Sequence, residues 1–507
     1  MKQIIIQFSL SILIPVYGWS QHKNDYNWIM GTNGLDLAHK YGGTKLSFSS
    51  FPPDTSSFYL PTEMAIDITS ISDSSGVLQF YTNGCKILNA KHKVIENGDK
   101  LNYPSEGYDD ACQYNLSYTL YRGIIALPVP TTDKQYFLFH LQQDFTHPIQ
   151  FPQSVLYSVI DMSANNGDGA VLKKNILLDK GIFYDMLASV KHGNGRDWWI
   201  AVPLVGSDDI GMYLLSPAGI EGPIYKNAPV AWQGQPNIFD RCFAVFSPDG
   251  KKYARFSGLN DLNVSSFDRC SGEFGNAVTI TFPTEMIWTT GLAFSPNSRF
   301  LYVVTGRKVY QFDTWENDIK ASKVLVGAVD GFMAPFGTSP YQPLLAPDGR
   351  IYISCTDGAY VLHTIHNPDA KGLDCHFVNH DFYLPTGNGF CLPNYPNFRL
   401  YDWAESPCDT IGINTPNDTL CSFSSEEKIL LTPNPASDFT LITAHHCNIK
   451  GMMSVYNLIG QLVYELYGID TGKTYDIDVS LWPTGIYMVV VRGEGKKVWT
   501  SKLVVAR

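Results

Sequence analysis

Short runs of alternating apolar and polar residues, separated by tight polar turns, fill most of the 507-residue chain. Three of these runs can be aligned on one another: FAVFSPDGKKYARFSG from Phe243, LAFSPNSRFLYVVTG from Leu292 and LLAPDGRIYISCTDG from Leu344. Each is typical of a β-hairpin, because proline fixes φ and glycine accepts the positive φ that the turn requires. The turn prolines Pro248, Pro296 and Pro347 are 48 and 51 residues apart, a period typical of the blades of a β-propeller.

Weaker copies of the same hairpin extend upstream, with turns near Gly76, Asp133 and Gly195. Together with the three clear copies, they predict six blades directly. A seventh blade can be formed from the two ends of the ring, Tyr26–Gly31 and Phe390–Trp403, which would remove exposed strand edges. We therefore predict an all-β, seven-bladed β-propeller, with six or eight blades as alternatives. Helical signal is nearly absent, since no capped 3.6-residue pattern is longer than about ten residues.

The order of these segments, from TSISDSSGVLQFYTNG through VKHGNGRDWWI and FAVFSPDGKKYA to GFCLPNYPNFRLYD, resembles the WD40-like propellers of secreted, cell-surface bacterial proteins. The resemblance covers roughly Asp25 to Trp403. In relatives the last element usually reads Gly-Leu-Pro-Asn-Phe, and Cys391 and Tyr395 depart from that pattern. The resemblance implies an architecture and no particular activity, because one propeller fold hosts many functions.

The composition changes after Trp403. Residues 404–428 are rich in Ser, Thr, Pro, Asn and Asp and lack periodicity, as is typical of a linker. From Ile429 to Arg507 the alternation returns, in about seven short segments with turn residues between them. This pattern predicts a small Ig-like β-sandwich.

The first twenty residues have the pattern of a targeting signal. Lys2 supplies a positive charge, Ile4 to Val16 is apolar, and small residues precede Gln21, as at a signal-peptide cleavage site. No later stretch approaches the roughly 18 apolar residues of a spanning helix, so we expect no transmembrane segment in the mature chain. The predicted domains are a signal peptide at 1–20, a propeller at 21–403, a linker at 404–428 and a β-sandwich at 429–507.

The C-terminal motifs, in their order, are similar to the type A C-terminal sorting domain of the type IX secretion system. The matching residues are Pro433, Asn434, Pro435, Ala436, Asp438, Gly460, Ile477, Asp478, Ser480, Gly485, Tyr487 and the segment Lys502–Arg507. The alternative is an ordinary Ig-like appendage that binds a partner or spaces the propeller. Several spaced motifs in the expected order favour the sorting domain.

This resemblance implies an export route and a set of partners. The N-terminal signal would carry the chain through the inner membrane, and the type IX machinery would carry it through the outer membrane of a Gram-negative bacterium. In that family a sortase-like peptidase usually removes the domain, and many cargoes are attached to surface lipopolysaccharide. We therefore expect a secreted or outer-membrane-attached protein of the cell surface.

Composition narrows the remaining possibilities. Lys and Arg number 37 against 48 Asp and Glu, a net charge of −11, which argues against nucleic acid and anionic lipid as partners. The ten cysteines would lie in an oxidising compartment. The sequence contains no CxxC pair, which argues against a zinc ribbon and against a thioredoxin-like redox site. The first disulfide pairings to consider are Cys408 with Cys421 and Cys242 with Cys270, and free buried thiols are the alternative for the others.

Candidate catalytic and metal-binding residues are few. His376 and His380 stand four apart, a metal-like spacing on a helix, whereas along a strand that spacing separates them by about 13 Å. His192 lies at a predicted hairpin turn, which explains it without catalysis. Neither a G-x-S-x-G elbow nor a D-x-[DN]-x-[DN]-G calcium loop is present. We therefore predict no catalytic residue, no metal ligand and no cofactor.

A propeller can bind partners through the loops between its blades and through its central funnel. The longest predicted excursions, Phe48–Glu63, Asn97–Ser117 and Gln143–Ser154, carry Tyr, Phe and Pro that suit protein or glycan contacts. Loops that only pack over blade edges are the alternative. We predict a non-enzymatic surface or secreted protein that recognises an extracellular protein or glycan. The alternatives are a hydrolase or lyase with its site in the central funnel, and a structural subunit of a surface adhesion or gliding assembly.

Two short motifs in the linker, Asp409–Ile411 and Asp418–Leu420, resemble the Asp-Thr-hydrophobic acceptor used for O-glycosylation in bacteria with this secretion route. They make Thr410 and Thr419 candidate modification sites. Three-residue patterns also occur often by chance, which is the alternative, and their place in the predicted linker makes the two readings equal.

Overall fold

The computed structural model describes residues 22–506 except for 34–40, 131, 133, 145–150, 230–241, 259–260, 283–289, 357, 405, 410–428, 445–449, 459–460, 471–473 and 494–497. The predicted signal peptide, both candidate glycosylation sites, Cys421, Gly460 and the turn at Asp133 lie outside the described residues. The chain divides into two compact units, Met1–Ile413 and Asn414–Arg507. The division falls inside the predicted linker, and each unit is described by itself.

The first unit is built of antiparallel strands that pair in chain order. Two sheets have three strands: β1 (Asn27–Thr32), β2 (Gly42–Ser47) and β3 (Asp54–Phe58), then β4 (Thr69–Ser72), β5 (Leu78–Thr82) and β6 (Ile87–Asn89). The third and fourth sheets are β7 (Ile124–Pro128), β8 (Gln135–Gln143), β9 (Pro152–Asp161) and β10 (Ala170–Lys180), then β11 (Ala188–Lys191), β12 (Trp198–Pro203), β13 (Asp209–Ser216) and β14 (Gly219–Asn227).

Three further four-stranded sheets follow: β15 (Phe243–Phe246), β16 (Lys252–Ser257), β17 (Asp261–Phe267) and β18 (Phe274–Ile280); β19 (Gly291–Phe294), β20 (Phe300–Val304), β21 (Lys308–Asp313) and β22 (Val324–Ala328); and β23 (Pro340–Leu345), β24 (Ile351–Cys355), β25 (Val361–Ile365) and β26 (Phe377–Tyr383). The helices are short: α1 (Glu106–Ala111) and the 3-10 turns η1 (Cys112–Tyr114), η2 (Asn165–Gly167) and η3 (Gly372–Cys375). The described residues thus form an all-β unit with seven sheets before Ile413.

The hairpins predicted from the three aligned repeats are confirmed. They are β15–β16, β19–β20 and β23–β24, with turn residues Gly250, Ser298 and Gly349 at φ of +70°, +63° and +81°. Ser298 adopts the left-handed conformation without being glycine, and its hydroxyl accepts a hydrogen bond from the Asp249 backbone N–H at 2.9 Å. This bond joins the turns of two successive sheets and helps to offset the cost of the positive φ.

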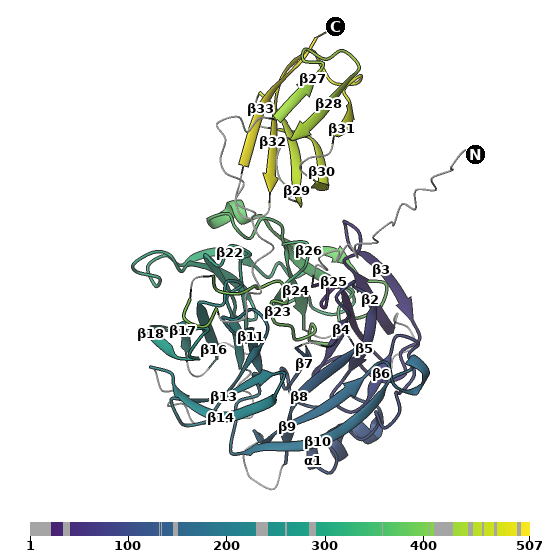
Figure 1. Ribbon diagram of the computed structural model, residues 1–507, viewed down its shortest axis with the longest axis vertical. Helices are drawn as coiled ribbons and strands as arrows, with labels where there is room; N and C mark the ends of the chain where they lie inside the picture. Colours follow the sequence, from purple (N-terminus) through teal and green to yellow (C-terminus); the bar gives the residue numbers. More distant parts are fainter. Residues whose placement is uncertain are drawn as a thin grey trace, which may run out of the picture. The chain divides into compact units, whose positions relative to one another are not determined.

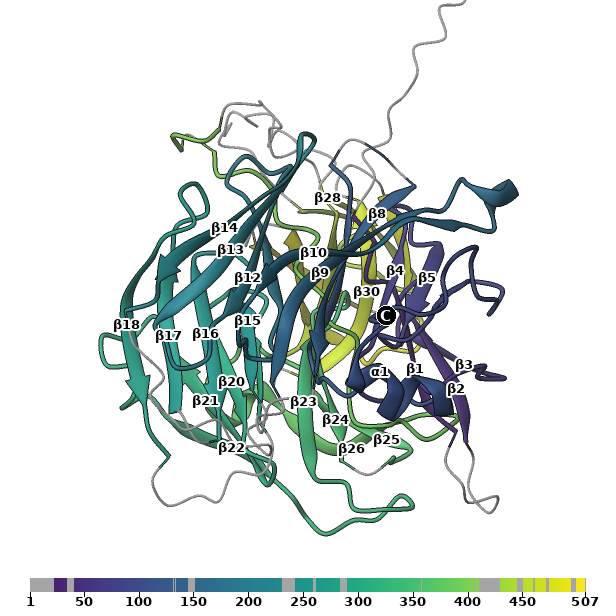
Figure 2. The same ribbon diagram turned by 90° about the horizontal axis from the view of Figure 1, so that it is seen from below.

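The sheets are arranged around a common axis. In Figure 1, β4, β7, β11 and β23 lie toward the middle, and β3, β6, β10, β14 and β18 lie at the rim. Figure 2 shows β15 to β18 side by side in the same order, from the inside outward. The hydrophobic core lies between successive sheets, where one continuous cluster joins the fourth to the fifth and others join the fifth to the sixth and the sixth to the seventh. This arrangement is a β-propeller, as predicted.

The first and the last sheets are neighbours through side-chain packing. Trp28 of β1 is fully buried and packs edge-on against Tyr352 of β24, with ring centroids 6.0 Å apart. The Thr44 and Thr386 hydroxyls are 2.7 Å apart across the same boundary. An aromatic pair of this geometry adds about 0.5–1.5 kcal/mol beyond the area that it buries.

The predicted seventh blade, made from both ends of the ring, is wrong. β1 pairs with β2, and β2 with β3, so the first sheet comes entirely from the N-terminal side. Residues 390–403 are described throughout and contain no strand. Pro393 and Pro396 explain this outcome, because proline cannot donate a ladder hydrogen bond in a central strand.

The predicted disulfide pairings are also corrected. Cys270 is bonded to Cys408, and Cys85 is bonded to Cys112. Cys242, predicted as the partner of Cys270, is buried and takes part in neither disulfide. The bonded pairs are 27 and 138 residues apart, and sequence spacing alone does not reveal connectivity over such separations.

The second unit consists of two antiparallel sheets. One contains β27 (Ile429–Thr432), β28 (Phe439–Ala444) and β31 (Thr474–Asp478); the other contains β30 (Leu462–Asp470), β29 (Lys450–Asn457), β32 (Gly485–Gly493) and β33 (Val498–Val505). Alternate residues of these strands, such as Val455, Val489 and Leu503, are fully buried between the sheets. The predicted β-sandwich is confirmed.

Candidate functional site

The axis of the propeller is filled by the chain itself. After β26, residues Gly389–Trp403, here called the axial segment, run along the inner strands of several sheets. The backbone N–H groups of Phe390 and Cys391 both donate to the Ala65 carbonyl at 2.9 Å, and the Ser354 hydroxyl donates to the Phe390 carbonyl at 2.7 Å. The axial segment is therefore attached to the second and seventh sheets where it enters.

Asn394 is the central residue of this segment and is almost fully buried. Its side-chain N–H groups donate to the carbonyls of Ile124 at 3.1 Å and Leu187 at 3.0 Å, next to the inner strands of the third and fourth sheets. Its backbone N–H donates to the Ile68 carbonyl at 3.1 Å, and its side-chain oxygen accepts from the Arg122 guanidinium. One asparagine thus satisfies polar groups of three sheets that would otherwise be buried without partners.

Two arginines lie along the segment, and Arg399 is paired with a carboxylate. Arg399 forms a bidentate ion pair with Asp25 at 2.7 and 2.8 Å. Burial opposes the charge on Arg399, but the Asp25 carboxylate outweighs it and raises the pKa of the guanidinium. Arg122 lies with its guanidinium 4.1 Å from the Phe243 ring centroid, and burial lowers its pKa to about 10, which leaves it charged at neutral pH.

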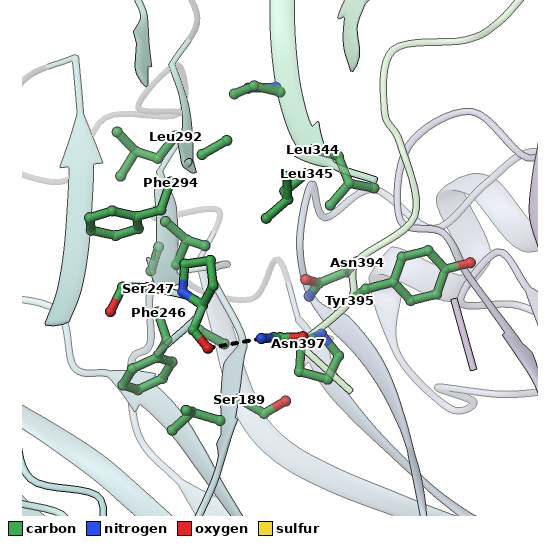
Figure 3. Close-up of a pocket in the computed structure, with 18 of the residues that line it drawn as sticks. Ser189, Phe246, Ser247, Leu292, Phe294, Leu344, Leu345, Asn394, Tyr395 and Asn397 are labelled. Carbon is green, nitrogen blue, oxygen red and sulfur yellow. Dashed lines mark hydrogen bonds between the residues drawn. The ribbon is translucent and has the colours of Figure 1, made fainter. Parts of the chain in front are cut away.

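One cavity beside the axial segment is small. A cavity of about 70 Å³ lies between the ends of the inner strands, and its lining includes Leu292, Leu344 and Ser189. Figure 3 shows Asn394 and Asn397 pointing into it, while Tyr395 points away, and Asn397 donates to the Pro248 carbonyl at 2.8 Å. Such a volume holds a few water molecules and no sugar or peptide substrate.

A cysteine–histidine pair that the sequence did not indicate lies in the seventh sheet. The Cys355 sulfur is 3.3 Å from Nε2 of His363, and both side chains are buried. The His380 backbone N–H donates to Nδ1 of His363, so the proton of the neutral ring is on Nε2 and points at the sulfur. Burial raises the pKa of the Cys355 thiol and lowers that of His363 to about 4. Both groups are therefore neutral, and the pair is not an activated nucleophile.

The histidines considered from sequence have structural partners. His192 accepts the Asn194 N–H at Nδ1 and lies 3.0 Å from the Cys270 carbonyl through Nε2, so it fastens the β11–β12 turn. His380 pairs with Asp330 at 2.8 Å and stacks on Phe332. His376 follows η3, and its ring lies against that of His366. Among the residues that the structure describes, no group of three or more His, Cys, Asp or Glu could hold a metal ion.

The first motif of the second unit is docked on the last strand. The Asn434 side chain donates to the Lys502 carbonyl at 2.7 Å and accepts from the Val504 N–H at 2.8 Å. Two residues later, the Ala436 N–H donates to the Val504 carbonyl at 2.8 Å, and the Ala506 N–H donates to the Ala436 carbonyl at 2.9 Å. Ala436 is buried, which limits this position to a small side chain.

This docking covers the free edge of β33, because β33 pairs with β32 only on its other side. An uncovered edge strand can pair with other chains. The segment from Asn434 to Ala436 supplies its donors and acceptors instead, using one side-chain amide as a substitute peptide group. The first motif and the C-terminal residues thus form a single hydrogen-bonded unit.

The remaining matched residues lie at turns and strand ends. The Pro433 carbonyl accepts from the Thr440 hydroxyl at 3.0 Å, and the Asp438 carbonyl accepts from the Val479 N–H at 2.8 Å. Asp478 caps the following turn by accepting the Ser480 N–H at 2.8 Å, and hydrogen bonds from the Ser480 hydroxyl and N–H lower the pKa of its carboxyl. Gly485 opens β32, and the Tyr487 hydroxyl donates to the Pro483 carbonyl at 2.7 Å. Pro435 is exposed between the two docking residues.

The two units define a protein with a propeller followed in sequence by a small β-sandwich. Residues 431–506 match the family described as "Secretion system C-terminal sorting domain". The predicted sorting domain is therefore confirmed, and it indicates export through the type IX secretion system to the cell surface or the medium. No described helix is long and apolar enough to cross a membrane. None of the curated proteins matches the chain.

Several solved structures are similar to the chain at low identity. A candidate 6-phosphogluconolactonase from Bacteroides uniformis is 14% identical over 72% of this chain and 99% of its own, with a TM-score of 0.43. The Dos1 propeller is 12% identical over 62% and 72%, with a TM-score of 0.35. A gluconolactonase from Xanthomonas campestris is 13% identical over 66% and 93%, with a TM-score of 0.30. At this level the similarity carries no argument about activity, and the propeller assignment rests on the chain's own strand pairing.

Proposed function

We propose that the first unit is a non-enzymatic binding module, which the sorting domain delivers to the outside of the cell for recognition of a protein or glycan. The observation that carries this proposal is a set of exposed apolar side chains on two loops that are hydrogen-bonded to each other. Tyr59, Tyr114 and Leu116, here called the tyrosine surface, are 87%, 67% and 45% exposed. Exposed tyrosines on ordered loops supply contact area at a small entropic cost, because they have only two rotatable side-chain bonds.

The loops that carry this surface are held in place before any ligand binds. The Cys85–Cys112 disulfide fixes the end of the second loop to the β5–β6 connection, and Ser105 caps α1 by accepting the Tyr108 N–H. The two loops are joined to each other, because the Glu63 N–H donates to the Asn115 carbonyl at 3.0 Å. A preorganised surface loses less entropy on binding. This rigidity supports a binding role over loops that only cover blade edges.

Binding to ligands from the natural surroundings tests the proposal. The mature secreted protein is immobilised and exposed to a glycan panel, to surface polysaccharide and to outer-membrane proteins, with affinity read by interferometry. The double variant Tyr59→Ser/Tyr114→Ser should bind at least about tenfold more weakly, since two aromatic contacts are each worth roughly 1–2 kcal/mol. Tyr383→Ser is the matched control, because Tyr383 is 63% exposed at the end of β26. Equal losses in both variants would refute the assignment of the surface.

The enzymatic alternative is tested with the same preparations. A hydrolase or lyase would release new reducing ends, unsaturated products or peptides from a bound ligand, whereas a binding module would leave it intact. The structural-subunit alternative would require the protein to co-purify in a stable surface assembly when no soluble ligand is present. Sustained turnover of any ligand would replace the binding proposal.

Attachment to the outer surface and processing by a sortase-like peptidase belong to the same proposal. Fractionation of cells that produce the chain with and without Ile429–Arg507 tests it, and arrival of the truncated chain at the cell surface would sink it. Intact-mass measurement of the native protein tests modification at Thr410 and Thr419, and a mass equal to that of the bare chain would exclude it.

A further inference from the structure

A larger cavity, of about 310 Å³, lies where the first hairpins of three sheets meet. Its lining comes from the β4–β5 turn, the β7–β8 turn and the β11–β12 turn, closed by His22 and Asn24 on one side and Phe398 of the axial segment on another. Asn24 is itself fixed, because its side chain donates to the Ser72 carbonyl at 2.8 Å. We call this space the hairpin pocket.

Lys191, the last residue of β11, brings a buried positive charge to the hairpin pocket. The side chain is only 6% exposed, and its ammonium lies 4.7 Å from the Trp198 ring centroid. It donates one hydrogen bond, to the Gly195 carbonyl at 3.1 Å. An ammonium has three donors, and among the described residues no carboxylate lies within ion-pair distance of it.

The other charges at the hairpin pocket are compensated. Arg196, the other cation of the lining, is bound to Asp197 by two hydrogen bonds, at 2.7 and 3.1 Å. Burial lowers the pKa of His22 to about 4, so this ring is neutral at physiological pH. Burial, reinforced by Arg269, lowers the pKa of Lys191 to about 8 and does not remove its charge at neutral pH. One positive charge with unused donors therefore remains.

The rest of the lining combines apolar residues with the neutral polar side chains of Asn24, Ser74 and Thr132. Pro128, Val129 and Pro130 form one side, and Tyr136, Trp198 and Phe398 contribute aromatic rings. Pockets of this composition bind small organic molecules, with a few polar groups fixing their orientation. A single uncompensated cation matches a monoanion, whereas phosphate groups are usually held by several donors from arginines or from a helix N-terminus.

We propose that the hairpin pocket binds a small organic carboxylate, whose charged group pairs with Lys191 while its carbon skeleton lies against the proline and aromatic lining. The site is distinct from the tyrosine surface and does not depend on the binding role proposed for it. Pairing with a carboxylate would offset the cost of burying Lys191, which is large for an unpaired ion.

Calorimetric titration of the full mature protein tests the site. The probes are D-glucuronate and benzoate, with D-glucose and benzyl alcohol as neutral counterparts and inorganic phosphate as a competing anion. At least one carboxylate should bind ten times or more tightly than its neutral counterpart. The proposal is overturned if neither carboxylate binds, if the neutral counterparts bind equally well, or if phosphate binds more tightly.

Two variants locate the binding event. Lys191→Met should weaken carboxylate binding at least tenfold, whereas Lys252→Met, at a half-buried lysine that donates to the Ser298 carbonyl, should leave it unchanged. Val129→Trp fills the hairpin pocket from its rim and should also abolish binding, which keeps the test valid if Lys191→Met does not fold. Retention of wild-type affinity by Lys191→Met or by Val129→Trp would refute the proposal.

Discussion

Acidification should destabilise the propeller through one buried histidine, His140 of β8. The side chain has no exposed area, and burial lowers its pKa from 6.5 to about 3. Nδ1 lies 2.6 Å from the Asn102 side-chain oxygen, and Nε2 lies 3.1 Å from the Ser158 hydroxyl. Asn102 uses its N–H to bind the Gly84 carbonyl, so the ring proton is on Nδ1 and Nε2 accepts from Ser158. The neutral ring is therefore fully hydrogen-bonded.

A second proton would be placed against Ser158, whose oxygen already accepts the Asn175 N–H at 3.1 Å. The unfolded chain binds a proton at its ordinary pKa, so between the two pKa values the unfolded state binds more protons and stability falls as the pH falls. At a pH of about 4.5, two units below the unfolded value, this one group lowers the unfolding free energy by roughly 2–3 kcal/mol relative to neutral pH.

Urea unfolding of the secreted protein, followed by tryptophan fluorescence between about pH 7.5 and 4.5, measures the effect. His140→Gln should lose about 2–3 kcal/mol less unfolding free energy over this range than the wild type. Leu138→Val, in the same strand, is the control for general destabilisation and should keep the wild-type pH dependence. His22 and His363 also have pKa values lowered to about 4 and contribute equally in all three proteins. Parallel curves for the wild type and His140→Gln would refute the reasoning.

Three further predictions follow from other contacts. Asp67→Asn should raise the melting temperature at pH 8 more than at pH 5. Burial and the neighbouring Asp185 raise the pKa of the Asp67 carboxyl, so the wild-type native state loses stability as the pH rises. Equal shifts of the melting temperature at both pH values would contradict this. Cys408→Ser should lower the unfolding free energy by about 4–5 kcal/mol, since the disulfide closes a loop with a separation of 138 residues. Calorimetric unfolding measures this loss, and a transition at the wild-type temperature would contradict the prediction. Asn434→Ala should destabilise the sandwich by about 1–3 kcal/mol through two lost hydrogen bonds and reduce the secreted fraction on immunoblots, whereas Ser437→Ala should not.

The repeated hairpins could be predicted from sequence because they are local. Pro-Asp-Gly sets the turn of β15–β16 within a few residues. The regular spacing of such turns along the chain then predicts one sheet for each repeat. The axial segment could not be predicted in the same way, because Asn394 meets carbonyls 270 and 207 residues away. The signal that was available is the pair Pro393 and Pro396, which argues against a central strand. The apolar and aromatic residues around these prolines favoured a strand and outweighed that signal.

The sorting domain could be recognised from its motifs, but their physical role appeared only in the structure. The spacing of Asn434 and Ala436 suggests a turn before a strand, and nothing local indicates that both residues bind β33. Lys191 was missed for a related reason. A lysine beside the Asn194-Gly195 turn is typical of a solvated hairpin, and its burial depends on the neighbouring turns and on Phe398, which come from distant parts of the chain.

The Cys270–Cys408 disulfide determines how the propeller would respond to mechanical tension. If the protein is held to the cell surface through residues beyond Cys408, a pull on that tether reaches the disulfide before it reaches Trp403 or Asn394. The tension then enters the fifth sheet between β17 and β18 through a covalent bond. With the disulfide reduced, the same pull would reach the axial segment directly. Its hydrogen bonds would then break one after another, beginning at Trp403. Oxidation thus separates the tether from the centre of the ring.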